Sequence, residues 1–205
     1  AGLKWHSDSK VDIAEGSYGE GYGEHAEIKV KHGRKVIFMK EHARLDPCFV
    51  VIDRFYPLDD QMHLYEILWH FDSDDASVKR EDAASNAGDV ANQGLSVIST
   101  AQNGVKLAVL PASSKMLSLE IVKGQTEPEW QGWKSLEQGM QGEYGAIPTA
   151  VYTLAASAPV RQVTVLYPVK PGEECPVVDV TASNDVMDTR IELKLSDGEI
   201  VKLEE

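Results

Sequence analysis

Histidine side chains can transfer protons or bind a metal, and two of them lie in one apolar segment. His63 and His70 fall within the stretch 62–71 and are seven residues apart. Successive side chains of a strand alternate between its two faces, so this spacing places the two imidazoles on opposite faces. They could not chelate one metal ion without ligands from other segments. We therefore interpret each as a structural histidine rather than a ligand or a catalytic base.

Carboxylates give two further candidates. Asp53 interrupts the apolar run 49–52, and a buried carboxylate needs a charged or hydrogen-bonding partner, so we predict a structural ion pair there rather than a catalytic acid. The run 72–75, Asp-Ser-Asp-Asp, offers oxygen ligands for calcium. It lacks the central glycine and terminal glutamate of an EF-hand loop, and we interpret it as a solvated acidic loop. His70 and Asp72 form at most a common histidine–carboxylate pair.

Three aromatic residues share the Gly- and Gln-rich connection 123–147. Trp130, Trp133 and Tyr144 could stack on sugar rings if their faces are exposed, or could anchor the loop to the core. Both interpretations stay open, and the trio is our candidate substrate-binding set.

Many catalytic signatures are missing from the sequence. It contains no nucleophile elbow, phosphate loop, dinucleotide fingerprint, His-Glu-x-x-His or Cys-x-x-Cys. Cys48 and Cys175 are the only cysteines, which excludes a Cys-rich zinc site and leaves two thiols or one disulfide. We assign no catalytic residue and no metal ligand.

The charge balance excludes some partners. The 205 residues carry 20 Lys and Arg against 33 Asp and Glu, a formal charge of −13. No basic stretch provides the positive surface that nucleic-acid binding requires, and the overall sign opposes strong long-range attraction of an anionic polysaccharide. No apolar run is long enough for a membrane span. The length suits one large domain, residues 1–205.

The elements that must position these residues are short β-strands. Apolar and β-branched runs bounded by Gly, Asn, Asp or Pro predict about a dozen strands, too many for one sheet, so we expect an all-β antiparallel sandwich of two packed sheets. The predicted strands are 26–32, 34–40, 48–55, 62–71, 94–100, 104–110, 116–122, 149–156, 161–167, 177–182, 188–195 and 199–203. Turns are predicted at His32-Gly33, Asn103-Gly104 and Asp197-Gly198.

Two strands carry further expectations. The last hairpin alternates apolar Ile191, Leu193 and Leu195 with polar residues, which is typical of a ribbon covering a core. The segment 62–71 has apolar residues at both odd and even positions, which predicts a strand with neighbours on both of its faces, although a buried helix remains an alternative. Long polar connections are expected at about 72–93 and 123–147.

Several pieces of sequence, in order, resemble the C-terminal region of heparinase II/III-like polysaccharide lyases. The likeness spans roughly residues 5–170. The matching pieces are Arg34–Lys40, Phe49–Phe55 with its Val-Val-Ile-Asp, His63–Glu66, Trp69–Phe71, the Gly132-Trp133-Lys134-Ser135 loop, Pro148, and Val163–Pro168 ending in Tyr-Pro.

The resemblance implies an antiparallel β-sandwich that accompanies an N-terminal α/α toroid, absent from this chain, in an enzyme acting on uronate-containing polysaccharide. Such lyases cleave by β-elimination. In the family, a His-x-His-x-Asp-like cluster opens the β region and supplies a histidine and metal ligands. Nothing before Trp5-His6 matches that cluster, so we transfer no catalytic residue, and His6 stays unassigned.

We therefore expect a supporting, cleft-forming domain that is catalytically silent alone. It would carry no cofactor, although the parent enzyme could hold a divalent metal such as zinc, and it would work in the periplasm or outside a bacterial cell. The alternatives are a carbohydrate-binding module that uses the three aromatic residues, and a structural sandwich whose apolar patch is covered by its missing neighbour.

Overall fold

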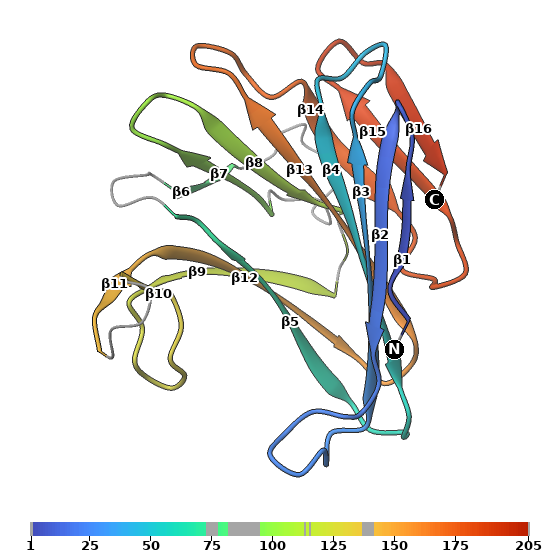
Figure 1. Cartoon of the computed structure of the whole chain (residues 1–205), viewed down its shortest axis with the longest axis vertical. Helices are drawn as coiled ribbons and strands as arrows, with labels where there is room; N and C mark the ends of the chain where they lie inside the picture. Colours follow the sequence, from blue (N-terminus) through green and yellow to red (C-terminus); the bar gives the residue numbers. More distant parts are fainter. Residues whose placement is uncertain are drawn as a thin grey trace, which may run out of the picture.

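The computed structural model describes residues 2–72, 78–81, 95–112, 114, 116–136 and 142–204, and over these ranges the chain folds into antiparallel strands without a helix. No helix that could cross a membrane therefore occurs in the described part. An eight-stranded sheet forms the centre (Figure 1). In spatial order its strands are β1 (Lys4–Ser7), β2 (Val11–Tyr18), β3 (Val30–Met39), β4 (Cys48–Pro57), β13 (Val160–Val169), β8 (Lys106–Pro111), β7 (Ser96–Thr100) and β6 (Val78–Glu81).

A small sheet covers one face of this large sheet. It contains β14 (Val177–Ala182), β15 (Arg190–Leu195) and β16 (Ile200–Glu204). Ile191, Leu193 and Leu195 of β15 pack with Val50 and Ile52 of β4 in a first core. This arrangement confirms that the last hairpin covers a core with its apolar side.

A second three-stranded sheet covers the opposite face. It contains β5 (His63–His70), β12 (Pro148–Ala156) and β9 (Leu117–Lys123), in that order. Tyr65, Ile67, Tyr152 and Leu154 pack with Phe55 of β4 in a second core. The large sheet therefore lies between two smaller ones, and the predicted all-β antiparallel sandwich is confirmed, with a covering sheet on each face (Figure 1).

The remaining strands form a hairpin of β10 (Trp133–Ser135) and β11 (Tyr144–Ala146). Both lie in the connection 123–147 that sequence analysis treated as a loop. The prediction also missed β1, β2 and β6. These strands are short or rich in polar residues and glycine, so they lack the dense apolar runs by which the others were found.

Two of the three predicted turns are confirmed and one is wrong. Gly104 and Gly198 have φ values of 81° and 88°, as tight turns require. The predicted His32-Gly33 turn does not exist, because β3 continues through it and pairs with β2 and β4 along its length. Gly33 has no positive φ, and a Cβ there would meet only the carbonyl oxygen of Gly16, at 3.9 Å.

The segment 62–71 is a strand, not a helix, but it does not have neighbours on both faces. Tyr65 and Ile67 are buried on its inner side, whereas Leu64 on the outer side is 73% exposed. The prediction of two covered faces is therefore wrong for β5. The apolar residue at this position is a surface leucine.

The covering sheet β14–β16 should contribute substantially to stability. Leu193 is fully buried in the first core, so Leu193→Ala should lower the free energy of unfolding by about 2–5 kcal/mol through lost burial and a residual cavity. The matched control Leu64→Ala removes an exposed side chain and should change it by less than about 0.5 kcal/mol. Urea titration followed by tryptophan fluorescence measures both, and equal effects would contradict this packing.

Candidate functional site

The three aromatic residues singled out in the sequence lie together. The Trp130 and Trp133 rings stack with centroids 5.4 Å apart and planes inclined by 14°, and Tyr144 meets Trp130 edge to face at 4.8 Å. Trp130 is 54% exposed and Tyr144 is 49% exposed. The cluster therefore offers an aromatic surface to solvent, and its role in binding stays a prediction.

The backbone around this aromatic cluster is close-packed. Gly132 has a φ of 78°, and a Cβ there would lie 2.9 Å from the backbone nitrogen of Gly124. Trp133 donates a hydrogen bond from Nε1 to the carbonyl oxygen of Gln125 at 2.8 Å. Trp133 thus anchors the segment while its stacked partner Trp130 is exposed, so the anchoring interpretation fits Trp133 and sugar contact by Trp130 stays a prediction.

Acidic and amide groups surround the aromatic cluster. Gln131 lies beside Trp130 in the chain, and its Nε2 donates to Glu66 at 3.2 Å and to Glu129 at 3.3 Å. Lys134 forms an ion pair with Asp72. A carboxylate-rich surrounding disfavours an anionic ligand, so this surface is better suited to an uncharged sugar.

A buried carboxylate lies between the large sheet and β5. Asp53 is 0% exposed, and its Oδ1 lies 2.7 Å from both Nε2 of His32 and Nε of Arg34. Arg34 makes a second bond to Oδ2 at 3.1 Å, and its guanidinium lies 5.7 Å from the centre of the Trp69 ring. The structure thus contains the predicted ion pair. Its partners were missed because cross-strand register joins them, and His32 had been assigned to a turn.

Aromatic rings extend this polar cluster into the second core. The His32 ring stacks on Phe55 with centroids 4.7 Å apart, and Phe55 stacks on Tyr65 at 4.3 Å. Burial raises the pKa of the Tyr65 phenol, so it stays protonated at neutral pH. The arrangement fixes His32 between a carboxylate and a ring, which is a structural use of histidine.

The other singled-out side chains are engaged separately. His63 lies 2.7 Å from Asp59, so its partner is local. His6, left unassigned from the sequence, lies 3.1 Å from Asp8 on the exposed strand β1. Asp72 pairs with Lys134, and the rest of the proposed acidic loop, 73–75, lies outside the described residues.

Metal ligands do not come together in the described part of the chain, where no three His, Cys, Asp or Glu side chains form a group that could hold an ion. These residues therefore do not fit the divalent metal that the lyase resemblance suggests for a parent enzyme.

The two cysteines are not joined in a disulfide. Cys48 is buried in the first core and Cys175 is half-buried against it. Burial, and to a smaller extent Cys175, raises the pKa of the Cys48 thiol to about 11. A thiol that stays protonated at neutral pH is a poor nucleophile, so Cys48 is a core residue rather than a catalytic one.

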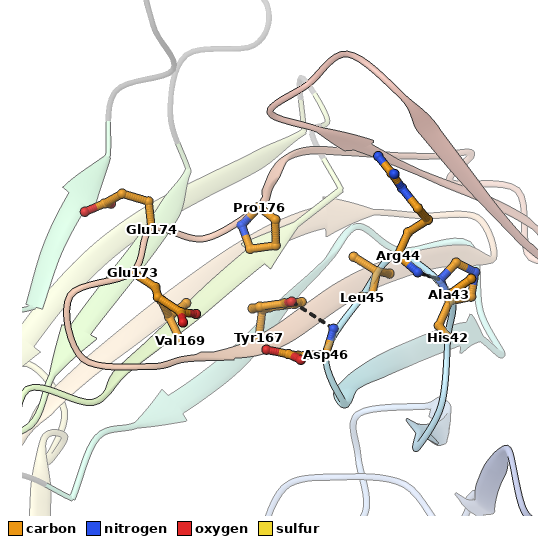
Figure 2. Close-up of a pocket in the computed structure, with 10 residues that line it drawn as sticks. All are labelled: His42, Ala43, Arg44, Leu45, Asp46, Tyr167, Val169, Glu173, Glu174 and Pro176. Carbon is orange, nitrogen blue, oxygen red and sulfur yellow. Dashed lines mark hydrogen bonds between the residues drawn. The ribbon is translucent and has the colours of Figure 1, made fainter.

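A hollow of about 460 Å³ opens where the segment after β3 meets the end of β13 (Figure 2). The backbone nitrogen of Asp46 donates to the Tyr167 hydroxyl oxygen at 3.1 Å on its floor. Arg44 on its rim is paired with Asp197 and Glu199. Further acidic residues line it, so it has no surplus of positive charge for an anionic ligand.

Comparison with known proteins shows what this fold resembles. No family model matches the chain, and no curated protein matches it in sequence. Among solved structures, the heparan sulfate lyase HepC from Pedobacter heparinus superimposes with a TM-score of 0.68 at 16% identity, over 98% of this chain and 27% of that one. A heparinase III gene product gives 0.65 at 16% over 99% and 27%. A further heparinase III gives 0.62 at 14% over 98% and 26%.

The class that these matches define is an all-β domain with the fold of one part of heparinase III. The chain spans about a quarter of the length of these structures. The resemblance drawn from the ordered strand motifs is therefore confirmed at the level of the fold.

The Asp53 cluster should contribute strongly to stability. Asp53→Asn removes the negative charge that balances Arg34 and should lower the free energy of unfolding by about 3 kcal/mol. The exposed Asp60 provides the control Asp60→Asn, which should change it by less than about 0.5 kcal/mol. Chemical denaturation measures both, and an Asp53→Asn protein as stable as the control would contradict a structural ion pair.

Proposed function

We propose that this chain is the supporting, cleft-forming β-domain of a heparinase-like lyase that cleaves uronate-containing polysaccharide by β-elimination. The observation that carries the proposal is the fold match over 98–99% of the chain to about a quarter of a heparan sulfate lyase and of heparinase III. On this proposal an N-terminal α/α toroid completes the enzyme, which works in the bacterial periplasm or outside the cell. Any divalent metal, such as zinc, belongs to groups outside the described residues.

The chemistry requires groups beyond those found here. β-Elimination needs neutralisation of the uronate carboxylate, a base for the C5 proton and an acid for the departing oxygen. In the described residues His6, His32 and His63 each lie 2.7–3.1 Å from a carboxylate, and no metal group forms. The domain's part is to hold substrate and to complete a cleft, while proton transfer is the task of the toroid.

The lyase proposal predicts activity only in the larger protein. A longer form containing the toroid should release unsaturated uronate products from heparan sulfate, seen as a rise in ultraviolet absorbance. The 205-residue chain alone should release none, because the proposal assigns the base and the acid to the toroid. Product release by the isolated chain would contradict the supporting role, and its absence from the longer form with several acidic polysaccharides would contradict the lyase itself.

A carbohydrate-binding role is the second candidate, favoured by the exposed stack of Trp130 on Trp133 with Tyr144 at its edge. Aromatic faces of this kind stack on the C–H face of a sugar ring. The acidic surroundings of Glu66 and Glu129 make a neutral glycan the better ligand.

The aromatic cluster can be tested with a matched pair of tryptophans. Trp130→Ala should lower the affinity for a neutral oligosaccharide identified by glycan array at least tenfold, because it removes the exposed stacking face. Trp5→Ala removes a 66% exposed tryptophan from β1 and should leave affinity unchanged. Calorimetric titration measures both. Equal affinities of the two variants, or no neutral glycan bound at all, would contradict the binding role.

A further inference from the structure

A second hollow, of about 550 Å³, lies on the large sheet at the N-terminal strands β1–β4 and the segment after β4. Its polar lining residues are Lys4, Glu15, Ser17, Lys31, Arg54 and Tyr56, together with Arg34 of the Asp53 cluster. Apart from Arg34, their side chains lie on the face of the large sheet that carries the first core, beyond the part covered by β14–β16. The hollow is thus separate from the aromatic cluster and shares only Arg34 with the Asp53 cluster.

Bare backbone forms the floor of this hollow. Gly33 lies between Ser17 of β2 and Arg54 of β4 in the sheet register. A Cβ added at Gly33 would meet only the carbonyl oxygen of Gly16, at 3.9 Å, so open space lies above it. A flat floor without side chains lets a ring-shaped ligand approach the sheet closely.

Cations dominate the walls. Lys4, Lys31 and Arg54 contribute positive charge, as does Arg34, which Asp53 balances from the other side. Glu15 is the acidic residue of the lining, 3.4 Å from Lys4. The ammonium group of Lys31 lies 6.0 Å from the centre of the Tyr56 ring. This local excess is notable in a chain with a formal charge of −13. The positive charge of this hollow would attract an anionic partner, although the net negative charge of the chain opposes one.

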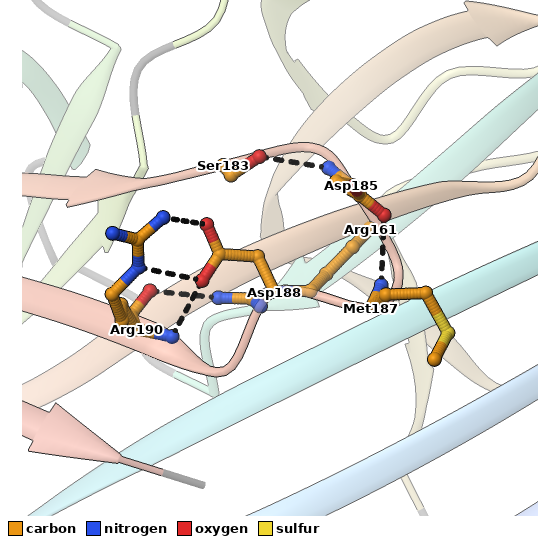
Figure 3. A network of polar contacts seen from close by, with 6 residues as sticks. All are labelled: Arg161, Ser183, Asp185, Met187, Asp188 and Arg190. Carbon is orange, nitrogen blue, oxygen red and sulfur yellow. Dashed lines mark hydrogen bonds and ion pairs between the residues drawn. The ribbon is translucent and has the colours of Figure 1, made fainter.

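A buried arginine lies beside this hollow. Arg161 of β13 pairs across the sheet with Arg54, is 0% exposed, and donates from Nη2 to the carbonyl oxygen of Arg190 at 3.0 Å. The loop 183–189 passes over it, and Asp188 in that loop is bound by Arg190 at 3.0 and 3.1 Å (Figure 3). The hydrogen bonds from Arg190 are the main cause that lowers the pKa of Asp188 to about 2.

Asp188 therefore stays ionised near Arg161, with its charge balanced by Arg190. The hollow at Tyr167, in contrast with the one over Gly33, is lined by Asp46, Glu173 and Glu174.

We propose that the hollow over Gly33 binds an anionic sugar unit of an acidic polysaccharide, with Lys31 and Arg54 on its carboxylate or sulfate and the sugar ring over Gly33 and beside Tyr56. This inference rests on the proposed function, because it names a surface by which the domain holds the polysaccharide. The paired cations, the hydroxyl groups of Ser17 and Tyr56 and the bare floor supply the charge, hydrogen bonds and space that such a unit needs.

The test uses the 205-residue chain and two sets of size-matched oligosaccharides, one of sulfated heparan sulfate and one of an unsulfated uronate polymer. Titration calorimetry should show binding that weakens as salt rises. Tighter binding of the sulfated set assigns the sulfate as the bound group, and equal binding assigns the carboxylate. Both outcomes support the site, and no binding of either set overturns it.

Variants then locate the site. Gly33→Leu fills the hollow without changing charge, and Lys31→Glu reverses one wall charge on an exposed side chain. Each should raise the Kd at least tenfold, with folding checked by circular dichroism. Lys10→Glu makes the same charge change at an exposed lysine in the β1–β2 turn and should have less than a twofold effect. If Lys31→Glu and Lys10→Glu weaken binding equally, or if a folded Gly33→Leu binds normally, the site is wrong.

The outcomes separate this inference from the lyase proposal. Binding that depends on Gly33 and Lys31, in a protein whose longer form has no lyase activity, would overturn only the lyase. Lyase activity in the longer form together with variant-insensitive binding would overturn only the hollow.

Discussion

The structure depends on β4 and β13 being buried on both faces. Val50 and Ile52 of β4 enter the first core, while Phe55 enters the second, because alternate side chains of one strand point to opposite sides. Each core therefore needs its own small sheet, and both sheets must be in place to bury both faces of β4. Asp53 lies in this doubly covered strand, and its carboxylate is tolerated there because His32 and Arg34 of the adjacent β3 bind it. The ion cluster and the two cores thus depend on the same feature, the burial of β4 on both faces.

The same constraint explains where the two candidate binding surfaces lie. The sheet β14–β16 covers only part of its face of the large sheet, so the ends of β1–β4 beyond it stay open over Gly33. The connection after β9 carries the aromatic cluster at a different place in the fold. One surface is cationic and the other is surrounded by carboxylates. A lyase domain acting on acidic polysaccharide would use the first, and a module for neutral sugars would use the second.

Local patterns in the sequence predict most of the fold. Alternating or dense apolar runs located the strands of both cores, and Asn103-Gly104 and Asp197-Gly198 located two turns, because these signals depend only on neighbouring residues. The turn predicted at His32-Gly33 was wrong because the sequence alone does not distinguish a glycine within a strand from a glycine in a turn. The grouping of Trp130, Trp133 and Tyr144 could be predicted because the three residues share one connection. The partners of Asp53 and the hollow at Lys31, Gly33 and Arg54 could not be predicted, since cross-strand register brings these residues together from separate strands.

The central claim, that the domain holds an acidic glycan on the large sheet, can be tested residue by residue with NMR. Isotope-labelled chain titrated with a heparan sulfate oligosaccharide should show its largest amide shifts at Ser17, Lys31, Gly33 and Arg54, which line or floor the hollow. The indole signals of Trp130 and Trp133 should stay unchanged. Shifts confined to those indoles, or shifts scattered over exposed lysines without a maximum at Gly33, would contradict the account.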